Sequence, residues 1–311
     1  MNPAPPRVPV SRRQGLLLLA TVVLAWGFTW PLNKLILESL PPIWAVAARS
    51  TIGAATLFAL AGLTGRLAAP PRADLPVLLS ITLLHMVGFS VLSTIGLALV
   101  PAGRSVVLAY TTPLWVTPGA WLVLHERYSA RRMLGGLVGL AGLGALFNPM
   151  SFDWSNRAAV AGNLAILAAA LLWAGSILHI RGHRWVSTPF QLLPWELGLA
   201  SVILVPSAWL TAGVPEVDWT VELVLLLLYA GIPGTALAYW AVAMAGRGLP
   251  AIPTSLGLLA TPVVGVVASA AWLGEPVTTS LALAIALVVG GVALGLSADE
   301  AGPGGGTQPE R

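Results

Sequence analysis

The sequence predicts an all-α polytopic membrane protein with ten transmembrane helices. Hydrophobic residues make up 57% of the 311 residues and charged residues only 9%, and the mean hydropathy is +0.84. Such a composition is incompatible with a water-facing surface, and the apolar residues form runs long enough to cross about 30 Å of hydrocarbon. A repeated Thr-Pro element further divides the ten helices into two halves. Because the chain has no cysteine, disulfides, thiol nucleophiles and thiolate metal sites are excluded.

Charged residues and Pro/Gly-rich segments divide the apolar sequence into its spans. The first run continues to Leu37 and lacks a small-residue cleavage site, so it is interpreted as a transmembrane helix rather than a secretory signal. Both tails, 1–14 and 298–311, are rich in Pro and Gly and are expected to be disordered in the cytoplasm. The predicted spans are 15–37, 43–64, 74–97, 101–123, 130–147, 159–179, 189–211, 222–245, 251–272 and 278–297.

The distribution of arginine predicts the orientation in the membrane. With a cytoplasmic N-terminus, twelve arginines fall inside and only Arg104 and Arg157 outside, so the positive-inside rule places both termini in the cytoplasm. This pattern also explains the net charge of +4 without a nucleic-acid partner. Lys34 is the only lysine, and Ala, Gly and Leu are abundant. This bias is typical of a bacterium with a GC-rich genome, and indicates the inner (plasma) membrane.

Two segments carry the same proline and glutamate spacing. "AYTTPLWVTPGAWLVLHERY" at 109–128 and "LATPVVGVVASAAWLGEP" at 259–276 align at an offset of 149, which superposes Pro113 on Pro262 and Glu126 on Glu275. Five helices per half is an odd number, so Glu126 falls on the cytoplasmic side and Glu275 on the external side. The sequence therefore predicts an inverted-topology repeat, with halves at 15–147 and 159–297 joined by an external linker at 148–158.

These segments extend into longer stretches that resemble a known family. "PAGRSVVLAYTTPLWVTPGAWLVLHERYSARRMLGGLVGLAGLGAL" and "PAIPTSLGLLATPVVGVVASAAWLGEPVTTSLALAIALVVGGVAL" resemble the two domain signatures of EamA-type carriers in the drug/metabolite transporter superfamily. The resemblance covers nearly the whole chain outside the tails and is greatest to the YddG-type amino-acid exporters. It implies outward transport of amino acids, aromatic and apolar ones included. His125 departs from the pattern, which has glycine before the glutamate.

The paired prolines and glutamates have separate expected roles. A proline within a membrane helix frees a carbonyl and bends the axis. Pro113 and Pro262 are therefore predicted hinges, with static kinks as the alternative. Glu126 and Glu275 are interpreted as anchors that meet the N-terminal amides of the next helix, rather than as catalytic acids.

Two charges lie inside predicted spans, where charges are costly and point to function. Arg49 lies about two turns from the external end of the second helix, and Glu196 lies at a similar depth from the cytoplasmic end of the seventh. Their positions exclude a mutual ion pair. Each is either a snorkelling or locally paired structural charge or part of the pathway.

The middles of several spans hold aromatic and hydrogen-bonding residues. His85 lies at the midpoint of the third helix and requires a polar partner or a wet cavity. Trp26, Trp115 and Trp173 lie near the midplane, away from the headgroup belt, with simple packing as their alternative role. The expected substrate-binding residues are Trp26, Trp30, His85, Tyr110, Thr111, Trp115, Trp173 and Tyr239.

These features predict a carrier that works by alternating access, as a monomer in the lipid bilayer, on an amino acid or a related small metabolite. No central carboxylate accompanies His85, which would be mostly neutral at cytoplasmic pH, so facilitated diffusion is expected. A carrier for another metabolite or drug, including a proton-coupled one, is the alternative. An intramembrane lipid-modifying enzyme is less favoured because neither H-E-x-x-H nor G-x-S-x-G occurs. No metal, cofactor or catalytic residue is expected.

Overall fold

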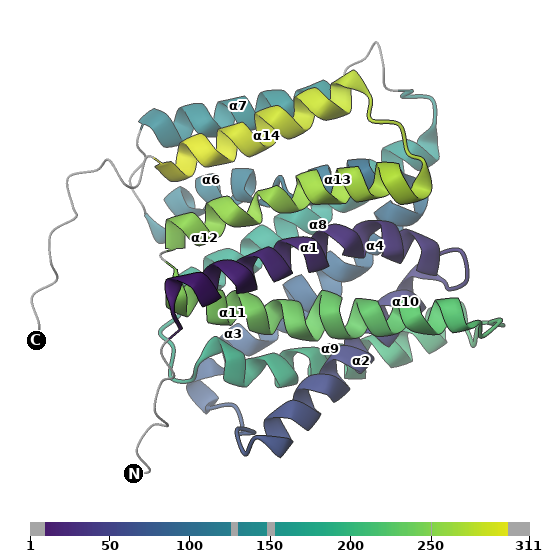
Figure 1. Ribbon diagram of the computed structural model, residues 1–311, viewed down its shortest axis with the longest axis vertical. Helices are drawn as coiled ribbons and strands as arrows, with labels where there is room; N and C mark the ends of the chain where they lie inside the picture. The colour runs from purple at the N-terminus through teal and green to yellow at the C-terminus, as the bar shows by residue number, and fades with distance from the viewer. Residues whose placement is uncertain (1–9, 126–129, 148–152, 250, 298–311) are drawn as a thin grey trace, which may run out of the picture.

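A computed structural model describes residues 10–125, 130–147, 153–249 and 251–297. Residues 1–9 and 298–311 of the predicted tails and 148–152 of the predicted linker lie outside these residues, whereas 12–14 belong to the first helix and 157–158 to the sixth. Ten helical crossings make up the described structure (Figure 1), and each lies within three residues of its predicted bounds. In order they are α1 (Arg12–Ile36), α2 (Pro42–Leu63), η1–α3–η2–α4 (Arg72–Leu99), α5–α6 (Ala102–Leu124), α7 (Ala130–Leu146), α8 (Arg157–Gly182), α9 (Pro189–Ala212), α10–η3–α11 (Val221–Gly248), α12–α13 (Ala251–Leu273) and α14 (Thr279–Ser297).

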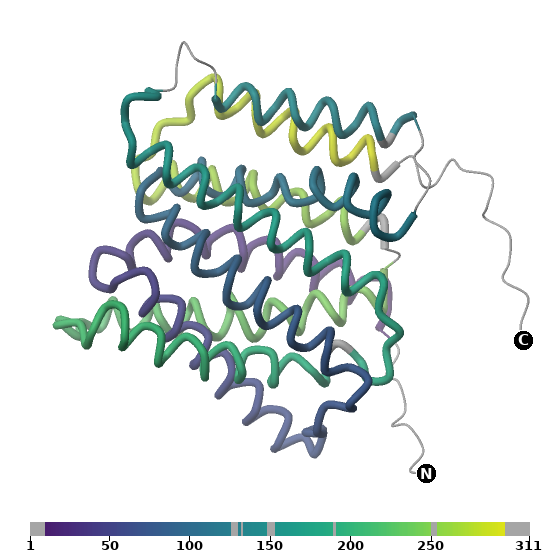
Figure 2. The backbone as a smooth tube through the Cα atoms, turned by 180° about the vertical axis from the view of Figure 1, so that it is seen from behind, coloured from purple at the N-terminus to yellow at the C-terminus, as the bar shows by residue number. Residues whose placement is uncertain are grey.

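The described chain is an all-helical polytopic membrane protein. Eight of its crossings contain at least 18 residues of sufficient hydropathy to span a bilayer, whereas the apolar parts of α7 and α14 are shorter. These two helices pair along one edge of the bundle, as both ribbon and tube views show (Figures 1 and 2). Their glycines meet directly, because a Cβ added at Gly135 would lie 2.4 Å from the Gly291 carbonyl oxygen. Small residues at such interfaces allow membrane helices to approach backbone to backbone.

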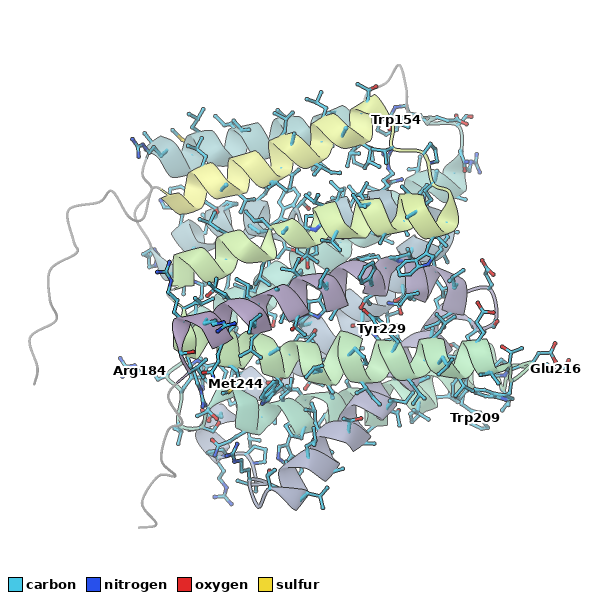
Figure 3. All side chains as sticks on the ribbon, viewed as in Figure 1. Trp154, Arg184, Trp209, Glu216, Tyr229 and Met244 are labelled. Carbon is cyan, nitrogen blue, oxygen red and sulfur yellow. The ribbon has the colours of Figure 1, made fainter. Side chains whose placement is uncertain are left out.

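The two halves repeat their element boundaries at the offset of 149. The helices α4 and α11 end at Leu99 and Gly248, and α7 and α14 begin at Ala130 and Thr279. The helix α1 begins and α14 ends at one end of the bundle, the left in Figure 1, which is called the terminal end below. Arg184 lies at the terminal end and Glu216 at the opposite end (Figure 3). Because each half has five crossings, the first half starts at the terminal end and the second half starts at the opposite end. The two halves therefore run through the bundle in opposite directions.

The corner at His125 keeps the conformation of the glycine it replaces. His125 has φ +53° and ψ +31°, and Gly274, its equivalent in the second half, has φ +65° and ψ +21°. Among the described residues, His125 is the only non-glycine with a positive φ. The left-handed conformation costs a residue with a Cβ about 1–2 kcal/mol. The departure of the sequence from the family pattern therefore leaves the shape of the helix end unchanged.

Both predicted proline bends occur as interruptions of a helix. The fourth crossing breaks at Tyr110–Thr111 between α5 (Ala102–Ala109) and α6 (Thr112–Leu124), and the ninth breaks at Leu259 between α12 and α13. Pro113 has no N–H for the Ala109 carbonyl, which instead accepts a hydrogen bond from Thr112 Oγ1 at 2.8 Å. The hinge role of Pro113 and Pro262 stays a prediction.

Two π-helical segments also occupy equivalent positions. They are η2 (Ile81–Phe89) in the third crossing and η3 (Ile232–Leu237) in the eighth. An offset of 149 maps the first onto 230–238, which contains the second. In η3 the ring of Pro233 removes one helical N–H, and Thr235 Oγ1 donates to Ala230 O at 2.7 Å. Such segments frequently mark functional sites, and His85 lies at the centre of η2.

Candidate functional site

A cavity of about 1070 Å³ runs from the centre of the bundle to the terminal end. Its lining includes Val10 before α1, Thr188 before α9, and Arg247 near the end of α11. All three lie where crossings begin or end at the terminal end. The volume is at the upper end of the range of small-molecule pockets.

A second cavity of about 70 Å³ lies beyond the first, toward the opposite end. It is lined by polar groups from α1, α2 and α4, among them Asn33, Arg49 and Thr94. Five residues line both cavities and separate them. This aromatic layer consists of Trp26, His85, Tyr110, Trp173 and Tyr239.

Side chains from both halves make contact within the aromatic layer. The His85 ring stacks on Trp173 with centroids 5.1 Å apart and planes inclined by 15°. Its Nε2 lies 3.2 Å from the Tyr239 hydroxyl, which supplies the polar partner that a histidine in hydrocarbon needs. Trp26 meets the edge of Tyr239, and Tyr110 meets Trp173 in the same way. The layer can therefore hold an apolar or aromatic group and offer it a few hydrogen bonds.

The structure brings only some of the predicted binding residues to these cavities. Trp30 lines the small cavity, whereas Thr111 and Trp115 line neither. Trp115 Nε1 donates to Thr111 Oγ1 at 3.2 Å, so these two residues share a face as their spacing predicts, but it is another face of α6. Thr112 lines the large cavity instead. The placement of Thr111 and Trp115 at the site is therefore corrected, because the sequence does not show which face of the helix points inward.

The two intramembrane charges lie on different sides of the aromatic layer. Arg49 lines the small cavity and Glu196 the large one. Neither side chain has a hydrogen bond or an ion pair with any residue the structure describes. Glu196 is only 4% exposed, and Tyr239 lines both cavities, one with each of the two charged residues. Pro113 also lines the large cavity, but Pro262 does not.

Glu275 of the second half binds the first half at the opposite end of the bundle. Its carboxylate oxygens accept hydrogen bonds from the backbone N–H groups of Ala102 at 2.6 Å and Gly103 at 2.8 Å. The anchor was expected at the start of the next helix, α14, and that expectation is wrong, because the helix whose N-terminus it caps is α5 of the other half. Glu126 lies outside the described residues.

Lys34 binds the last residues of the third crossing, also at the opposite end of the bundle. Its ammonium donates to the carbonyls of Leu97 at 2.6 Å, Ala98 at 3.3 Å and Val100 at 3.0 Å. A cation at the last carbonyls of a helix complements the helix dipole. Together with Glu275, Lys34 holds the helix ends between the small cavity and the opposite end.

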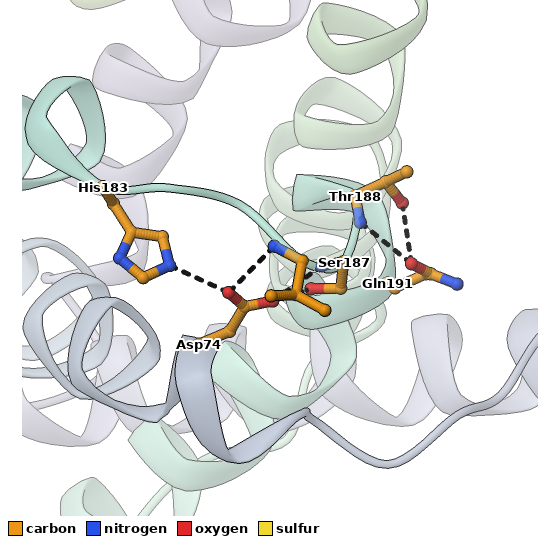
Figure 4. A network of polar contacts seen from close by, with 6 residues as sticks. Asp74, His183, Ser187, Thr188 and Gln191 are labelled. Carbon is orange, nitrogen blue, oxygen red and sulfur yellow. Dashed lines mark hydrogen bonds and ion pairs between the residues drawn. The ribbon is translucent and has the colours of Figure 1, made fainter.

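Asp74 forms a network of hydrogen bonds at the terminal end of the third crossing (Figure 4). Its carboxylate, fully buried, accepts hydrogen bonds from His183 Nε2 at 2.8 Å, Val186 N at 3.2 Å, and Ser187 N and Oγ at 2.7 and 2.6 Å. The contact joins the start of the third crossing to the segment between α8 and α9. Sequence reasoning missed Asp74, although it is an acid at the very start of a predicted span. His183 occupies the position equivalent to Lys34, so both ends of the third crossing are held by equivalent basic residues.

Replacement of Glu275 should loosen the opposite end. In Glu275→Gln, the amide keeps one acceptor but turns a donor toward a backbone N–H, so about 1.5–3 kcal/mol of charge-assisted hydrogen bonding is lost. The chain has no natural cysteine, so a cysteine introduced as Thr94→Cys in the small cavity reports access. We expect faster labelling by an impermeant thiol reagent from the opposite end. Glu216→Gln, at an exposed acid, is the control, and equal labelling rates in all backgrounds would contradict the assigned role.

Comparison with known proteins identifies the architecture. The model of the EamA-like transporter family matches residues 13–148 and 160–297. The chain belongs to the EamA-like transporter family. Each matched segment covers one half of the structure, so the duplicated five-helix unit corresponds to a family domain, and the protein is a transporter rather than an enzyme.

Several EamA relatives align along most of this chain. It is 26% identical to the uncharacterized transporter YoaV of Bacillus subtilis, over 89% of this chain and 94% of the relative. It is 29% identical to a probable amino-acid metabolite efflux pump of Salmonella typhimurium (90% and 94%) and 26% identical to the aromatic amino acid exporter YddG of Ancylobacter novellus (92% and 98%). One crystal structure aligns with a TM-score of 0.65 at 25% identity, over 92% of this chain and 98% of that one.

Proposed function

We propose that this EamA-family transporter exports amino acids, aromatic and other apolar ones, or similar small metabolites by alternating access. The observation that supports this most directly is the aromatic layer, which both halves build between a wide cavity and a small one. Aromatic faces can hold an apolar side chain or an ammonium group. The names of two relatives that align over 90% and 92% of this chain, an amino-acid metabolite efflux pump and an aromatic amino acid exporter, add further support.

The proposed orientation places the terminal end in the cytoplasm of a bacterial cell. It rests on the excess of arginine in the segments at that end. In this orientation the large cavity faces the cytoplasm, and Lys34 and Glu275 hold the external end. Substrate then enters from the cytoplasm and meets the aromatic layer, and Pro113 and Pro262 bend as the halves exchange conformations. A monomer suffices for this cycle, since one chain contains both halves.

We further propose facilitated diffusion, because no ionised pair or carboxylate cluster accompanies His85 in the described aromatic layer. One observation favours a second candidate, a proton-coupled carrier. The Glu196 carboxyl group lines the large cavity without a partner among the described residues, and such a group can take up and release a proton during transport.

Transport of labelled L-phenylalanine into proteoliposomes tests these alternatives. With no ion gradient, a facilitator equilibrates the solute, and an imposed pH gradient of either sign leaves the final level unchanged. Accumulation above the external concentration only when protons flow would refute facilitated diffusion, and Glu196→Gln should then abolish it. Absence of transport of any amino acid or apolar metabolite would refute the proposed function.

A further inference from the structure

The small cavity contains a cation that nothing in the described structure neutralises. Arg49 is the only charged residue among the described residues that line it. The guanidinium has no hydrogen-bond or ion-pair partner there, although guanidinium groups in dry surroundings are normally paired. His85 and Tyr239, two members of the aromatic layer, line the same cavity as Arg49. Arg49 therefore presents a free positive charge beside the layer.

The other lining groups suit an anion rather than a second cation. Thr29, Asn33, Ser93 and Thr94 also line the cavity and are neutral. The hydroxyls of Thr29 and Ser93 donate to Ala25 O and Ser90 O, which leaves the Asn33 amide and the Thr94 hydroxyl to donate to an anion. A planar guanidinium matches a carboxylate with two parallel N–H···O bonds. The cavity thus combines a bidentate donor with neutral donors around it.

The sizes of the two cavities decide which part of a solute each one takes. At about 70 Å³ the small cavity has room for a small polar group such as a carboxylate. An aromatic side chain does not fit there, whereas the large cavity of about 1070 Å³ holds it easily. The exposed Arg247 at the mouth of the large cavity also favours the approach of anions.

From this arrangement we infer that Arg49 binds the carboxylate of the transported solute, which enters carboxylate first and leaves its apolar side chain at the aromatic layer. This inference deepens the proposed function and rests on it for the direction of transport. It narrows the substrate class to solutes with a free carboxylate. Amino-acid amides and amines of the same shape are excluded, because a neutral or cationic head would leave Arg49 unpaired.

Ligand binding to the purified full-length protein tests the inference. The probes are L-phenylalanine, 3-phenylpropionate, L-phenylalaninamide and 2-phenylethylamine, titrated by intrinsic tryptophan fluorescence. We expect both carboxylates to bind at least about tenfold more tightly than the amide and the amine, since charge-assisted bidentate bonds are lost. In Arg49→Gln this preference should disappear while the affinity for the amide stays within about twofold. Arg66→Gln, at an exposed arginine outside both cavities, should keep the preference.

Arg49→Lys extends the test if Arg49→Gln does not fold, because lysine keeps the charge but loses the bidentate geometry. An intermediate preference supports the inference. Equal binding of phenylalanine and its amide to the wild type, an unchanged preference in both Arg49 variants, or no binding of either carboxylate overturns it. Transport of phenylalanine and its amide at equal rates would leave the proposed function intact and refute only the role of Arg49. Arg49-dependent binding of 3-phenylpropionate without transport of any amino acid would refute the proposed function and leave the role of Arg49 in carboxylate binding intact.

Discussion

Trp173→Ala is expected to lower the rate of substrate transport at least about tenfold while folded protein remains in the membrane. Trp173 stacks on His85 and also contacts Phe89 and Tyr110, with ring centroids 5.1, 5.0 and 6.2 Å apart. Each aromatic pair contributes about 0.5–1.5 kcal/mol beyond burial, and about 1.4 kcal/mol corresponds to a factor of ten. Alanine removes all three contacts and merges the two cavities.

Trp115→Ala provides the matched control, because the same side chain is removed at a similar depth from a position outside both cavities. Initial rates of labelled phenylalanine uptake, normalised to the amount of reconstituted protein, measure the effect. We expect Trp115→Ala to change the rate less than about threefold. Equal losses in both variants would show that general packing, and not the aromatic layer, determines transport.

Gly135→Leu should prevent the pairing of α7 and α14. Even a single Cβ at this position would lie 2.4 Å from the Gly291 carbonyl oxygen and 2.8 Å from the Gly295 amide nitrogen, and backbone atoms cannot rotate away as a side chain can. Overpacking by one methylene commonly costs about 1–3 kcal/mol, so leucine should exceed the upper value. The measurement is the thermal unfolding midpoint in detergent, together with the yield of monodisperse protein.

Gly136→Leu is the control on the neighbouring position of the same helix. A Cβ added at Gly136 meets no atom within 4 Å, so leucine at this half-buried position, which lines the large cavity, makes no backbone clash with α14. Gly135→Ala should fall between the two. If Gly135→Leu and Gly136→Leu unfold at the same temperature, the close pairing of α7 and α14 does not contribute to stability.

Hydropathy and proline placement predicted the architecture because both act locally along the chain. Apolar length determines a membrane crossing, and a proline removes its own N–H wherever it occurs. All ten crossings and the interruptions near Pro113 and Pro262 were accordingly predictable. The contact of Glu275 with the start of α5 was not, since the N-terminus it caps is 172 and 173 residues away in sequence.

The candidate site was predictable in composition but only partly in geometry. Residue type and depth identified His85, Trp173 and Tyr239, which the structure brings together. They also identified Trp115, whose face depends on how α6 rotates after the break at Tyr110–Thr111. The network around Asp74 depends on the segment between α8 and α9, which no local pattern assigns to it.

Each of the two π-helical segments contains one more residue than an α-helix would need there. The number of residues in the third and eighth crossings therefore determines which way their side chains point. A π-helical ladder bonds residues five apart where an α-helix bonds residues four apart. Deleting one residue from 81–89 would restore α-helical hydrogen bonding. Because each residue turns an α-helix by about 100°, the side chains on one side of the deletion would then point about 100° away from their present direction. Because the two segments occupy equivalent positions, the same constraint on residue number applies once in each half.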